Sequence, residues 1–474
     1  MAFAHETYLG LAAFLLFLVT LAHPRPGTAR RLALVLAAVA VATAAWSFGA
    51  RGELFHGTYR VDAFSQAFKF LLAVGLFLAV AFGEGLRGVE PEHEPEYLLF
   101  LTLSVLGLTF LVSSIELLTI YISLELSSYS LYVLVPLRRV EHRSRVEAGI
   151  KYVLFGAVAS GISLFGMSYV FGLAHTTQVD RLLEAFPTLA TSPLGLIGLA
   201  MMLGGFFFKL ALFPFHFWTP DIYQGAANET SGVIATLPKV GAVAVLIRLT
   251  GLGGHDNGSF LAVLTALAML SMTYGNLAAL VQTDLKRLLA YSSISHAGFM
   301  ITGILTGTVR GYAGAMYYVG GYVLMNLALF YVIYSLAPRG ENVTVGHLKG
   351  LYRRAPVLAF TLAVGAFGLA GIPPTAGFAG KFFVLAAALE QGHLALVIFG
   401  AVNTAISIYY YLKMVKAAYS PEEEEAGGEP LPGAVPLSPV GVGLGGAFAV
   451  SILAVGAFPG WFMALFHRAL EWVV

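Results

Sequence analysis

The sequence predicts an all-α protein that crosses a membrane many times. Of its 474 residues, 58% are hydrophobic and only 11% are charged, whereas a soluble domain carries about 25% charged residues. Apolar stretches long enough to span a bilayer, about 20 residues each, recur from one end of the sequence to the other. A transmembrane barrel would instead alternate apolar and polar residues over segments of about 10 residues. We therefore expect a single polytopic integral membrane domain over residues 1–474.

About fourteen transmembrane helices are expected, and each corresponds to one apolar stretch. They cover residues 7–22, 31–50, 62–83, 97–112, 115–136, 149–173, 192–217, 231–250, 259–282, 287–306, 312–337, 356–389, 394–419 and 438–466. The first stretch follows neither a basic segment nor a small-residue cleavage site, so we interpret it as a retained helix rather than a signal peptide. The acidic, Pro- and Gly-rich segment 420–436 is interpreted as a solvated connector.

Arginine and lysine in the connecting segments predict the orientation. With the N-terminus outside, 17 of these residues fall on the cytoplasmic side and 6 on the outer side, and four lysines lie within the spans. Basic residues are enriched in cytoplasmic loops. We therefore expect a multi-pass protein of the bacterial cytoplasmic (inner) membrane with its N-terminus outside.

Two of the expected helices, the seventh and the twelfth, contain helix-breaking sequences. The seventh contains Pro214 and continues into HFWTPDIYQG, and the twelfth contains GIPPTAGFAGK with Pro373 and Pro374. Proline removes a backbone donor and clashes with the preceding turn, so both helices are expected to be broken. Backbone left unpaired at membrane depth is tolerated only where it faces protein or a wet cavity.

The two breaks lie at matching places in two halves of the chain. Residues 97–250 and 259–419 each hold five expected helices, and the fourth helix of each half is the broken one. Paired broken helices indicate an internal repeat with the transport site at the breaks. Because each half has an odd number of helices, the repeat is inverted. The first three helices (1–96) and the acidic loop with the last helix (420–474) lie outside it.

Charged residues interrupt several apolar stretches. Glu125 is expected mid-span in the fifth helix, Lys209 before the seventh-helix break, Lys239 mid-span in the eighth helix, and Lys381 after the twelfth-helix break. A charge at the bilayer centre costs at least about 2.5–3.5 kcal/mol and usually marks an ion or proton path. Lys69 lies only about two turns inside its helix, close to Asp62, and we expect its side chain to snorkel to the outer interface.

Glutamate and lysine together have the chemistry of a proton relay. Burial disfavours the charged form of a lysine and a nearby carboxylate favours it, so movement of the carboxylate switches the lysine between holding and releasing a proton. The tenth helix follows the loop residues Asp284, Lys286 and Arg287 and carries several hydroxyls and His296, which can take or give a proton near neutral pH. The alternative interpretations are static ion pairs for the charges and a packing role for the histidine.

The composition excludes other kinds of chemistry. The sequence contains no cysteine and therefore no thiolate ligand for an iron–sulfur cluster and no disulfide. Its net charge of +1 favours no polyanionic partner such as nucleic acid. We expect no metal site, because the sequence has no zinc-ligand spacing.

Four segments resemble the antiporter-like proton channels of respiratory complex I. They are FKLALFPFHFWTPDIYQGA, LPKVGAVAVLIRL, TDLKRLLAYSSISHAGFM and GIPPTAGFAGKFFVL. The stretch SLELSSYSLYVLVPLRR is most similar to the subunit N branch of bacterial NADH:quinone oxidoreductases. The resemblance covers roughly the fourth to thirteenth helices.

The resemblance implies fourteen helices with inverted five-helix repeats and a proton-relay role for Glu125, Lys209, Lys239 and Lys381. It also implies a translocase subunit of a hetero-oligomer that contacts other membrane subunits and lipid. NAD, flavin, iron–sulfur clusters and quinone would bind partner subunits, and this chain would bind no cofactor. Two alternatives remain at this point: a D-type subunit of a multisubunit sodium–proton antiporter, and a structural scaffold without transport.

Overall fold

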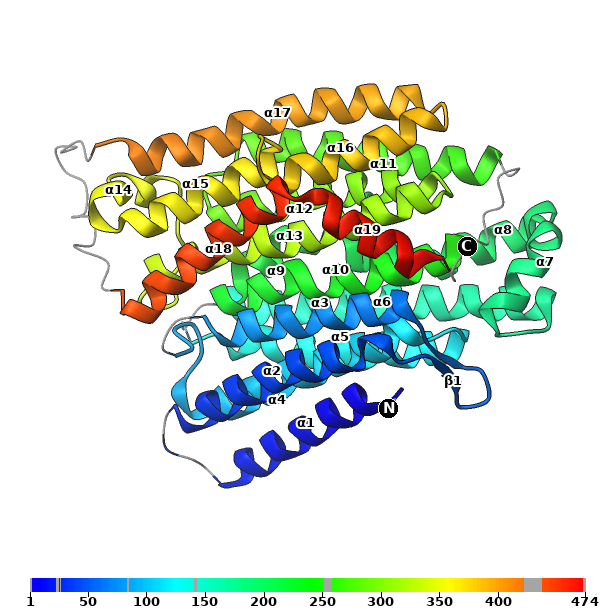
Figure 1. Ribbon diagram of the computed structural model, residues 1–474, viewed down its shortest axis with the longest axis horizontal. Coiled ribbons are helices and arrows are strands. Elements are labelled where there is room, and N and C mark those ends of the chain that lie inside the picture. Colours follow the sequence, from blue (N-terminus) through cyan, green and yellow to red (C-terminus); the bar gives the residue numbers. More distant parts are fainter. Residues whose placement is uncertain are drawn as a thin grey trace.

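The structure is a computed structural model that describes residues 2–22, 25, 27–82, 85–139, 143–250, 258–421 and 437–471. Most of its long helices run in one common direction (Figure 1). Both chain ends lie towards the end of the molecule that carries the β1 hairpin and α7, and α14 lies at the opposite end (Figure 1). The acidic segment 420–436 lies outside the described residues except for residues 420 and 421.

The N-terminal part holds three long helices and a small hairpin. Its elements are α1 (Ala4–Ala22), α2 (Thr28–Trp46), a 3₁₀ turn (Ser47–Gly49), β1 (Gly52–Leu54), β2 (Tyr59–Val61) and α3 (Ala63–Val80). Asp62 begins α3 with a capping box, in which its carboxylate accepts the Ser65 N–H at 2.7 Å and the Ser65 hydroxyl accepts the Asp62 N–H at 3.0 Å. The hairpin was not predicted, because three-residue strands are too short to produce an alternating pattern.

The next part of the chain contains the first broken helix. Its elements are a 3₁₀ turn (Pro91–His93), α4 (Glu94–Ser113), α5 (Leu117–Leu134), a 3₁₀ turn (Val135–Leu137), α6 (Arg143–Ala174), α7 (Val179–Thr191), α8 (Pro193–Leu210), α9 (Thr219–Gly225) and α10 (Asn228–Thr250). Helix α8 ends at Leu210, and Ala211 follows in the left-handed conformation with φ 60°. The Leu212 N–H then bonds to the Phe207 carbonyl at 2.9 Å, which is the closing bond of a Schellman motif.

The last part repeats this pattern at the second break. Its elements are α11 (Gly258–Leu280), α12 (Leu285–Leu305), α13 (Val309–Leu336), a 3₁₀ turn (Gly346–Leu348), α14 (Leu351–Arg354), α15 (Pro356–Ala370), α16 (Ala376–Glu390), α17 (Leu394–Tyr419), α18 (Pro439–Ala457) and α19 (Pro459–Leu470). Helix α15 ends at Ala370, Gly371 is left-handed with φ 85°, and the Ile372 N–H bonds to the Phe367 carbonyl at 2.9 Å. The two breaks therefore have the same backbone geometry.

The predicted all-α fold with many membrane-spanning helices is confirmed. Thirteen helices of the described residues are long and apolar enough to cross a membrane, and the remaining expected span, residues 356–389, consists of the shorter α15 and α16. Besides the hairpin, two further details differ from expectation. The segment 173–192, expected as a connector, contains α7, and the last span is divided into α18 and α19.

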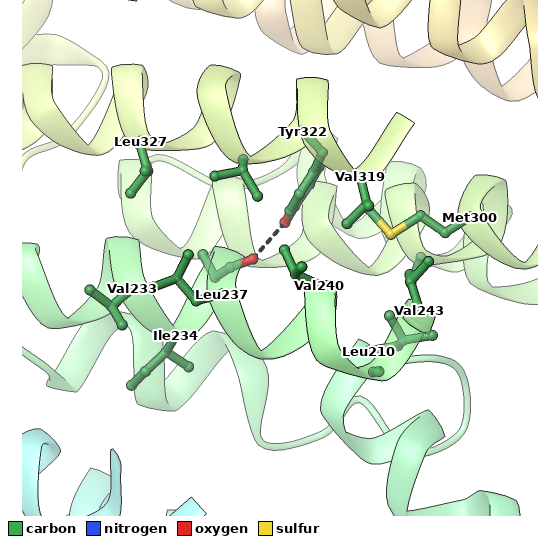
Figure 2. Close-up of a cluster of buried hydrophobic side chains, with 14 of the residues drawn as sticks. Leu210, Val233, Ile234, Leu237, Val240, Val243, Met300, Val319, Tyr322 and Leu327 are labelled. Atoms are coloured by element: carbon green, nitrogen blue, oxygen red, sulfur yellow. Dashed lines mark hydrogen bonds between the residues drawn. The ribbon is translucent and has the colours of Figure 1, made fainter. Parts of the chain in front are cut away.

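The centre of the molecule is formed by α10, α12 and α13. In an apolar stretch of 18 residues, 100% of the residues of α10 are buried, compared with 39% in α6 and 28% in α18. Side chains from α10 and α13, such as Leu237, Val240 and Val319, pack together there, and the Tyr322 hydroxyl donates to the Ala235 carbonyl at 3.1 Å (Figure 2). Polar groups on these central helices have no lipid or bulk solvent beside them, so they need protein or internal water as partners.

Candidate proton-relay site

Glu125 and Lys209 are near one another without forming an ion pair. Glu125 lies buried on α5, and its Oε1 accepts the hydroxyl of Ser160 on α6. Lys209 is the second-last residue of α8, and it is close enough to Glu125 for the two charges to interact electrostatically. Among the described residues, however, no carboxylate oxygen lies within 4.0 Å of Lys209 Nζ. Glu125 and Lys209 are therefore neighbours whose charged groups are not in contact, and we call such a pair open.

Aromatic rings surround the Lys209 ammonium instead. Nζ lies 5.5 Å from the ring centre of Tyr132, 5.6 Å from that of Tyr152 and 5.6 Å from that of Phe208. Such distances allow cation–π attraction, which is strongest where water is excluded. Within the described part of the chain, Nζ and the hydroxyls of Tyr132 and Tyr152 have no hydrogen-bond partner. Buried polar atoms of this kind are commonly satisfied by internal water.

Lys239 and Lys381 each bind the last carbonyl of a helix that ends at a break. Lys239 Nζ donates to the Leu210 carbonyl at the end of α8, and Lys381 Nζ donates to the Ala370 carbonyl at the end of α15 at 3.0 Å. Each carbonyl directly precedes the left-handed residue of its break. The negative end of the helix dipole stabilises a cation at this position. Among the described residues, neither lysine has a carboxylate within 4.0 Å.

His296 lies on α12 between these two lysines. Its Nδ1 is 2.6 Å from the Tyr318 hydroxyl and its Nε2 is 3.1 Å from the Tyr411 hydroxyl. Tyr411 in turn bonds to Ser292. Both Lys239 and Lys381 are close enough to act electrostatically on the ring. The imidazole is therefore satisfied by hydrogen bonds and also placed where it can pass a proton along tyrosine and serine hydroxyls.

The five predicted site residues form a series. Glu125 faces Lys209, and Leu210, the next residue along α8, supplies the acceptor of Lys239. Lys239 and Lys381 then flank His296. All five side chains are buried, and each is linked to the next through an electrostatic neighbour or through the Leu210 carbonyl.

The prediction for Lys69 was wrong. Lys69 does not snorkel, because its side chain is fully buried and its Nζ lies 2.5 Å from Glu6 Oε1 on α1. The Tyr59 hydroxyl donates to the same oxygen at 2.6 Å. Glu6 lies at the edge of the first apolar stretch, where sequence reasoning overlooked it. The sequence offered one indication of this ion pair, namely an acidic residue near the start of one span and a lysine near the start of another.

Arg248 and Asp62 form a second enclosed ion pair. Both Asp62 oxygens accept Arg248 Nη2 at 3.0 Å. Burial raises the pKa of the Asp62 carboxyl, but the Arg248 charge and the Ser65 hydrogen bonds outweigh it and hold the pKa below its usual value. Lys69 and Arg248 therefore each have a buried carboxylate partner, unlike the three lysines of the series.

Two buried charges were missed at the other end of the molecule. Lys286, expected in a cytoplasmic loop, lies in the first turn of α12, where it is fully buried and donates to the Ala226 carbonyl at 2.7 Å. Glu229 is buried in the first turn of α10. Both residues lie at the ends of apolar stretches, where sequence alone does not separate a buried charge from a solvated one. No group of three or more potential metal-ligating side chains occurs among the described residues.

Comparison with known proteins identifies relatives of this chain. Residues 114–407 match the family model described as "NADH:quinone oxidoreductase/Mrp antiporter, TM". NADH-quinone oxidoreductase subunit N 2 of Opitutus terrae is 45% identical over 97% of this chain and 95% of its own length. The protein of the same name from Solidesulfovibrio magneticus is 48% identical over 89% of this chain and 88% of its own length.

Solved structures extend the comparison to the fold. A chain of respiratory complex I from Thermus thermophilus with bound Aureothin is 31% identical, with TM-score 0.84 over 98% of this chain and 100% of that chain. A chain of the Mrp complex from Dietzia sp. DQ12-45-1b has TM-score 0.87 over 99% of this chain and 96% of that chain, but at 18% identity the likeness concerns the fold alone.

The fold, the two breaks and the buried lysines therefore define an antiporter-like integral membrane protein. Together with the family match, the relatives allow a narrower assignment. The chain belongs to the membrane family shared by NADH:quinone oxidoreductases and Mrp antiporters, and within that family to the subunit N group of NADH-quinone oxidoreductases.

Proposed function

We propose that this chain translocates protons as a membrane subunit of a bacterial NADH:quinone oxidoreductase. The single observation that supports this most is the contrast between two kinds of buried cation. Lys69 and Arg248 have a carboxylate within 3.0 Å. Among the described residues, Lys209, Lys239 and Lys381 have no carboxylate within 4.0 Å, and aromatic rings or helix-end carbonyls contact their ammonium groups instead. A carboxylate at contact distance favours the charged lysine strongly, so lysines without one release a proton more readily.

Each residue of the series has a separate task in this proposal. Glu125 alternates between Ser160 and Lys209, and its approach favours the protonated form of Lys209. Lys239 carries the proton across the centre, where His296 and the hydroxyls around it connect Lys239 with Lys381. Lys381 releases the proton at the exit side. Water completes the gaps between these groups.

The two halves of the chain, 97–250 and 259–419, act as two half-channels related by an inverted repeat. Their equal break geometry supports this relation. A second equivalence lies on the first helix of each half, α4 and α11, where each packs against the helix that follows it. A Cβ added to Gly107 would meet the Ser127 nitrogen at 2.6 Å, and one added to Gly275 would meet the Ser295 nitrogen at 2.6 Å. In both halves glycine therefore allows the same close helix contact.

The electron-transfer chemistry belongs to other subunits in this proposal. The sequence has no cysteine to ligate a cluster. NAD, flavin, iron–sulfur clusters and quinone would bind partner subunits, and this chain would receive the energy through neighbouring membrane subunits. The excess of basic residues in connecting segments favours a cytoplasmic membrane location with the N-terminus outside.

Replacement of Lys209 by alanine in the assembled complex tests the proposal. We expect Lys209→Ala to assemble but to lose most proton pumping, because the carrier next to Glu125 is gone. Lys413→Ala, an exposed lysine on α17, is the matched control and should pump normally. Full pumping and normal coupled turnover by Lys209→Ala would contradict the assigned role.

A further inference from the structure

A second pair of buried opposite charges lies outside the series described above. Glu229 on α10 has 2% of its surface exposed and Lys286 on α12 has none. Each is close enough to act on the charge of the other. Among the described residues, however, no carboxylate oxygen lies within 4.0 Å of Lys286 Nζ. The pair is therefore open, in the same sense as Glu125 and Lys209.

Both members of this pair retain hydrogen-bonding capacity. Glu229 Oε1 accepts the Gly88 N–H at 3.0 Å, but Oε2 has no hydrogen-bond partner in the described part of the chain. Lys286 donates to the Ala226 carbonyl at 2.7 Å, and an ammonium has three donors. A buried carboxylate oxygen without a partner is costly unless it exchanges with water or a proton. Intramembrane ionisable groups of this kind are usually functional.

A cavity borders the end of α9, next to the residue that accepts the Lys286 hydrogen bond. Its volume is about 410 Å³, and Lys151, Asp221, Gln224, Gly225 and Asn342 are among its lining residues. Burial raises the pKa of Asp221, but Lys151 and Arg287 outweigh this effect and lower it, so Asp221 stays charged at neutral pH. We call this cavity the vestibule.

The vestibule and the acceptor of the Lys286 hydrogen bond are formed by consecutive residues. Gln224 and Gly225 line the vestibule, and the next residue, Ala226, is the acceptor of Lys286. Arg138, itself buried, fixes this turn by donating to the Gln224 carbonyl at 2.8 Å and to Asn342 Oδ1 at 2.8 Å. The ionisable groups that act on the Glu229–Lys286 pair include Arg138 and Asp284, the N-cap of α12. The hydroxyls of Tyr97 and Tyr334 also lie close to Glu229.

The inner side of the pair connects with the central histidine along α12. Lys286 and Ser293 are seven residues apart and so lie on the same face of the helix. The Ser293 hydroxyl is 3.4 Å from the Tyr223 hydroxyl of α9. His296 follows one turn later, about 15 Å from Lys286 along the helix axis at 1.5 Å per residue. Ser293 and Tyr223 thus place two buried hydroxyls part of the way from Lys286 to His296.

We propose that Glu229 and Lys286 form a proton-uptake station between the vestibule and His296. The inference rests on the proposed function, because it adds an entry point to the same relay. Water in the vestibule supplies a proton to the Glu229 carboxylate, and the proton leaves through Lys286 and the α12 hydroxyls. Only O–H and N–H bonds form and break, and no other reactant is needed.

The test compares two replacements of Glu229 in the assembled complex, with proton uptake measured in inverted membrane vesicles. Glu229→Gln retains an oxygen for the Gly88 N–H but cannot bind and release a proton. Glu229→Asp retains the carboxylate with a shorter reach. We expect Glu229→Gln to lower coupled proton uptake per assembled complex at least tenfold. We expect uptake by Glu229→Asp to be several-fold faster than uptake by Glu229→Gln. Glu92→Gln, an exposed carboxylate just before α4, is the matched control and should behave as the native protein.

The opposite order of the two variants would overturn the inference. If Glu229 only held the Gly88 backbone, Gln would function as well as or better than Asp. Failure of the Gln variant to assemble would likewise assign a structural role and reject the station. Normal uptake by Glu229→Gln together with lost pumping by Lys209→Ala would reject the station alone. Normal pumping by Lys209→Ala would instead reject the proposed function.

Discussion

The buried basic residues differ chiefly in what surrounds their charge. Lys69 and Arg248 contact carboxylates, Lys239 and Lys381 contact helix-end carbonyls, and Lys209 contacts aromatic rings. An ion pair stabilises one protonation state, whereas rings and carbonyls stabilise a cation more weakly and leave it able to change state. The distinction between structural and relay charges therefore lies in their partners.

Removal of the rings around Lys209 should weaken the relay. Tyr132→Leu and Tyr152→Leu each remove a cation–π contact worth about 0.5–2 kcal/mol. Lys209 then has less to hold it away from Glu125, so we expect coupled turnover to fall roughly 2- to 30-fold in each variant. The measurement is coupled electron transfer with simultaneous proton pumping in vesicles.

Two further variants make this comparison specific. Tyr169→Leu on α6 removes an aromatic ring outside the site and should leave turnover unchanged. If the rings act through competition with Glu125, their loss should matter less in a Glu125→Gln background. Additive losses in the double variants would indicate that the tyrosines only pack the helices.

Several candidate site residues could be predicted from the sequence because a charge inside an apolar stretch is costly and usually marks an ion or proton path. Glu125, Lys209, Lys239 and Lys381 were found in this way. The partners could not be predicted, since tyrosine and backbone carbonyls occur throughout membrane helices. Glu229 and Lys286 escaped because an end-of-helix charge has the same sequence pattern whether it faces water or protein.

At the level of the elements, the break between α8 and α9 and the break between α15 and α16 position residues of the proposed relay. Each break ends a helix in a left-handed residue and leaves a carbonyl facing a lysine. Proline and glycine in the sequence predict such breaks, and the helices end at the expected places. Helix α7 was missed because it is short, amphipathic and contains Pro187.

The Asp62–Arg248 pair should anchor α3 to α10. Asp62→Asn leaves Arg248 without its buried counter-charge, and such losses cost about 3–5 kcal/mol. We expect a lower thermal midpoint for the purified complex, whereas Asp180→Asn at a solvent-exposed pair should change it little. An unchanged midpoint in Asp62→Asn would show that the pair does not secure α3.

This anchor should also depend on pH. The folded-state pKa of Asp62 is below the usual carboxyl value, so its stabilising effect is present above that usual value. The effect is lost as the pH falls through the folded-state pKa. The difference in thermal midpoint between native protein and Asp62→Asn should therefore shrink only in acid.

At the scale of the whole molecule, the described helices enclose the residues of the proposed relay in an apolar body. The central helices α10, α12 and α13 are almost completely buried and carry Lys239, His296 and the tyrosines around them. Outer helices such as α6 and α18 present apolar faces to lipid or to neighbouring subunits. This arrangement allows charge to move through the centre without exposure to the bilayer.

Proton pumping by Lys239→Met in the reconstituted complex tests the central claim most directly. Methionine approximates the volume of lysine but cannot carry a proton, and Lys239 lies between both halves of the series. We predict an assembled complex whose ratio of protons pumped to electrons transferred falls well below that of the native complex. An assembled Lys239→Met complex with the native ratio would contradict the account, since the buried lysines would then serve only to hold helices together.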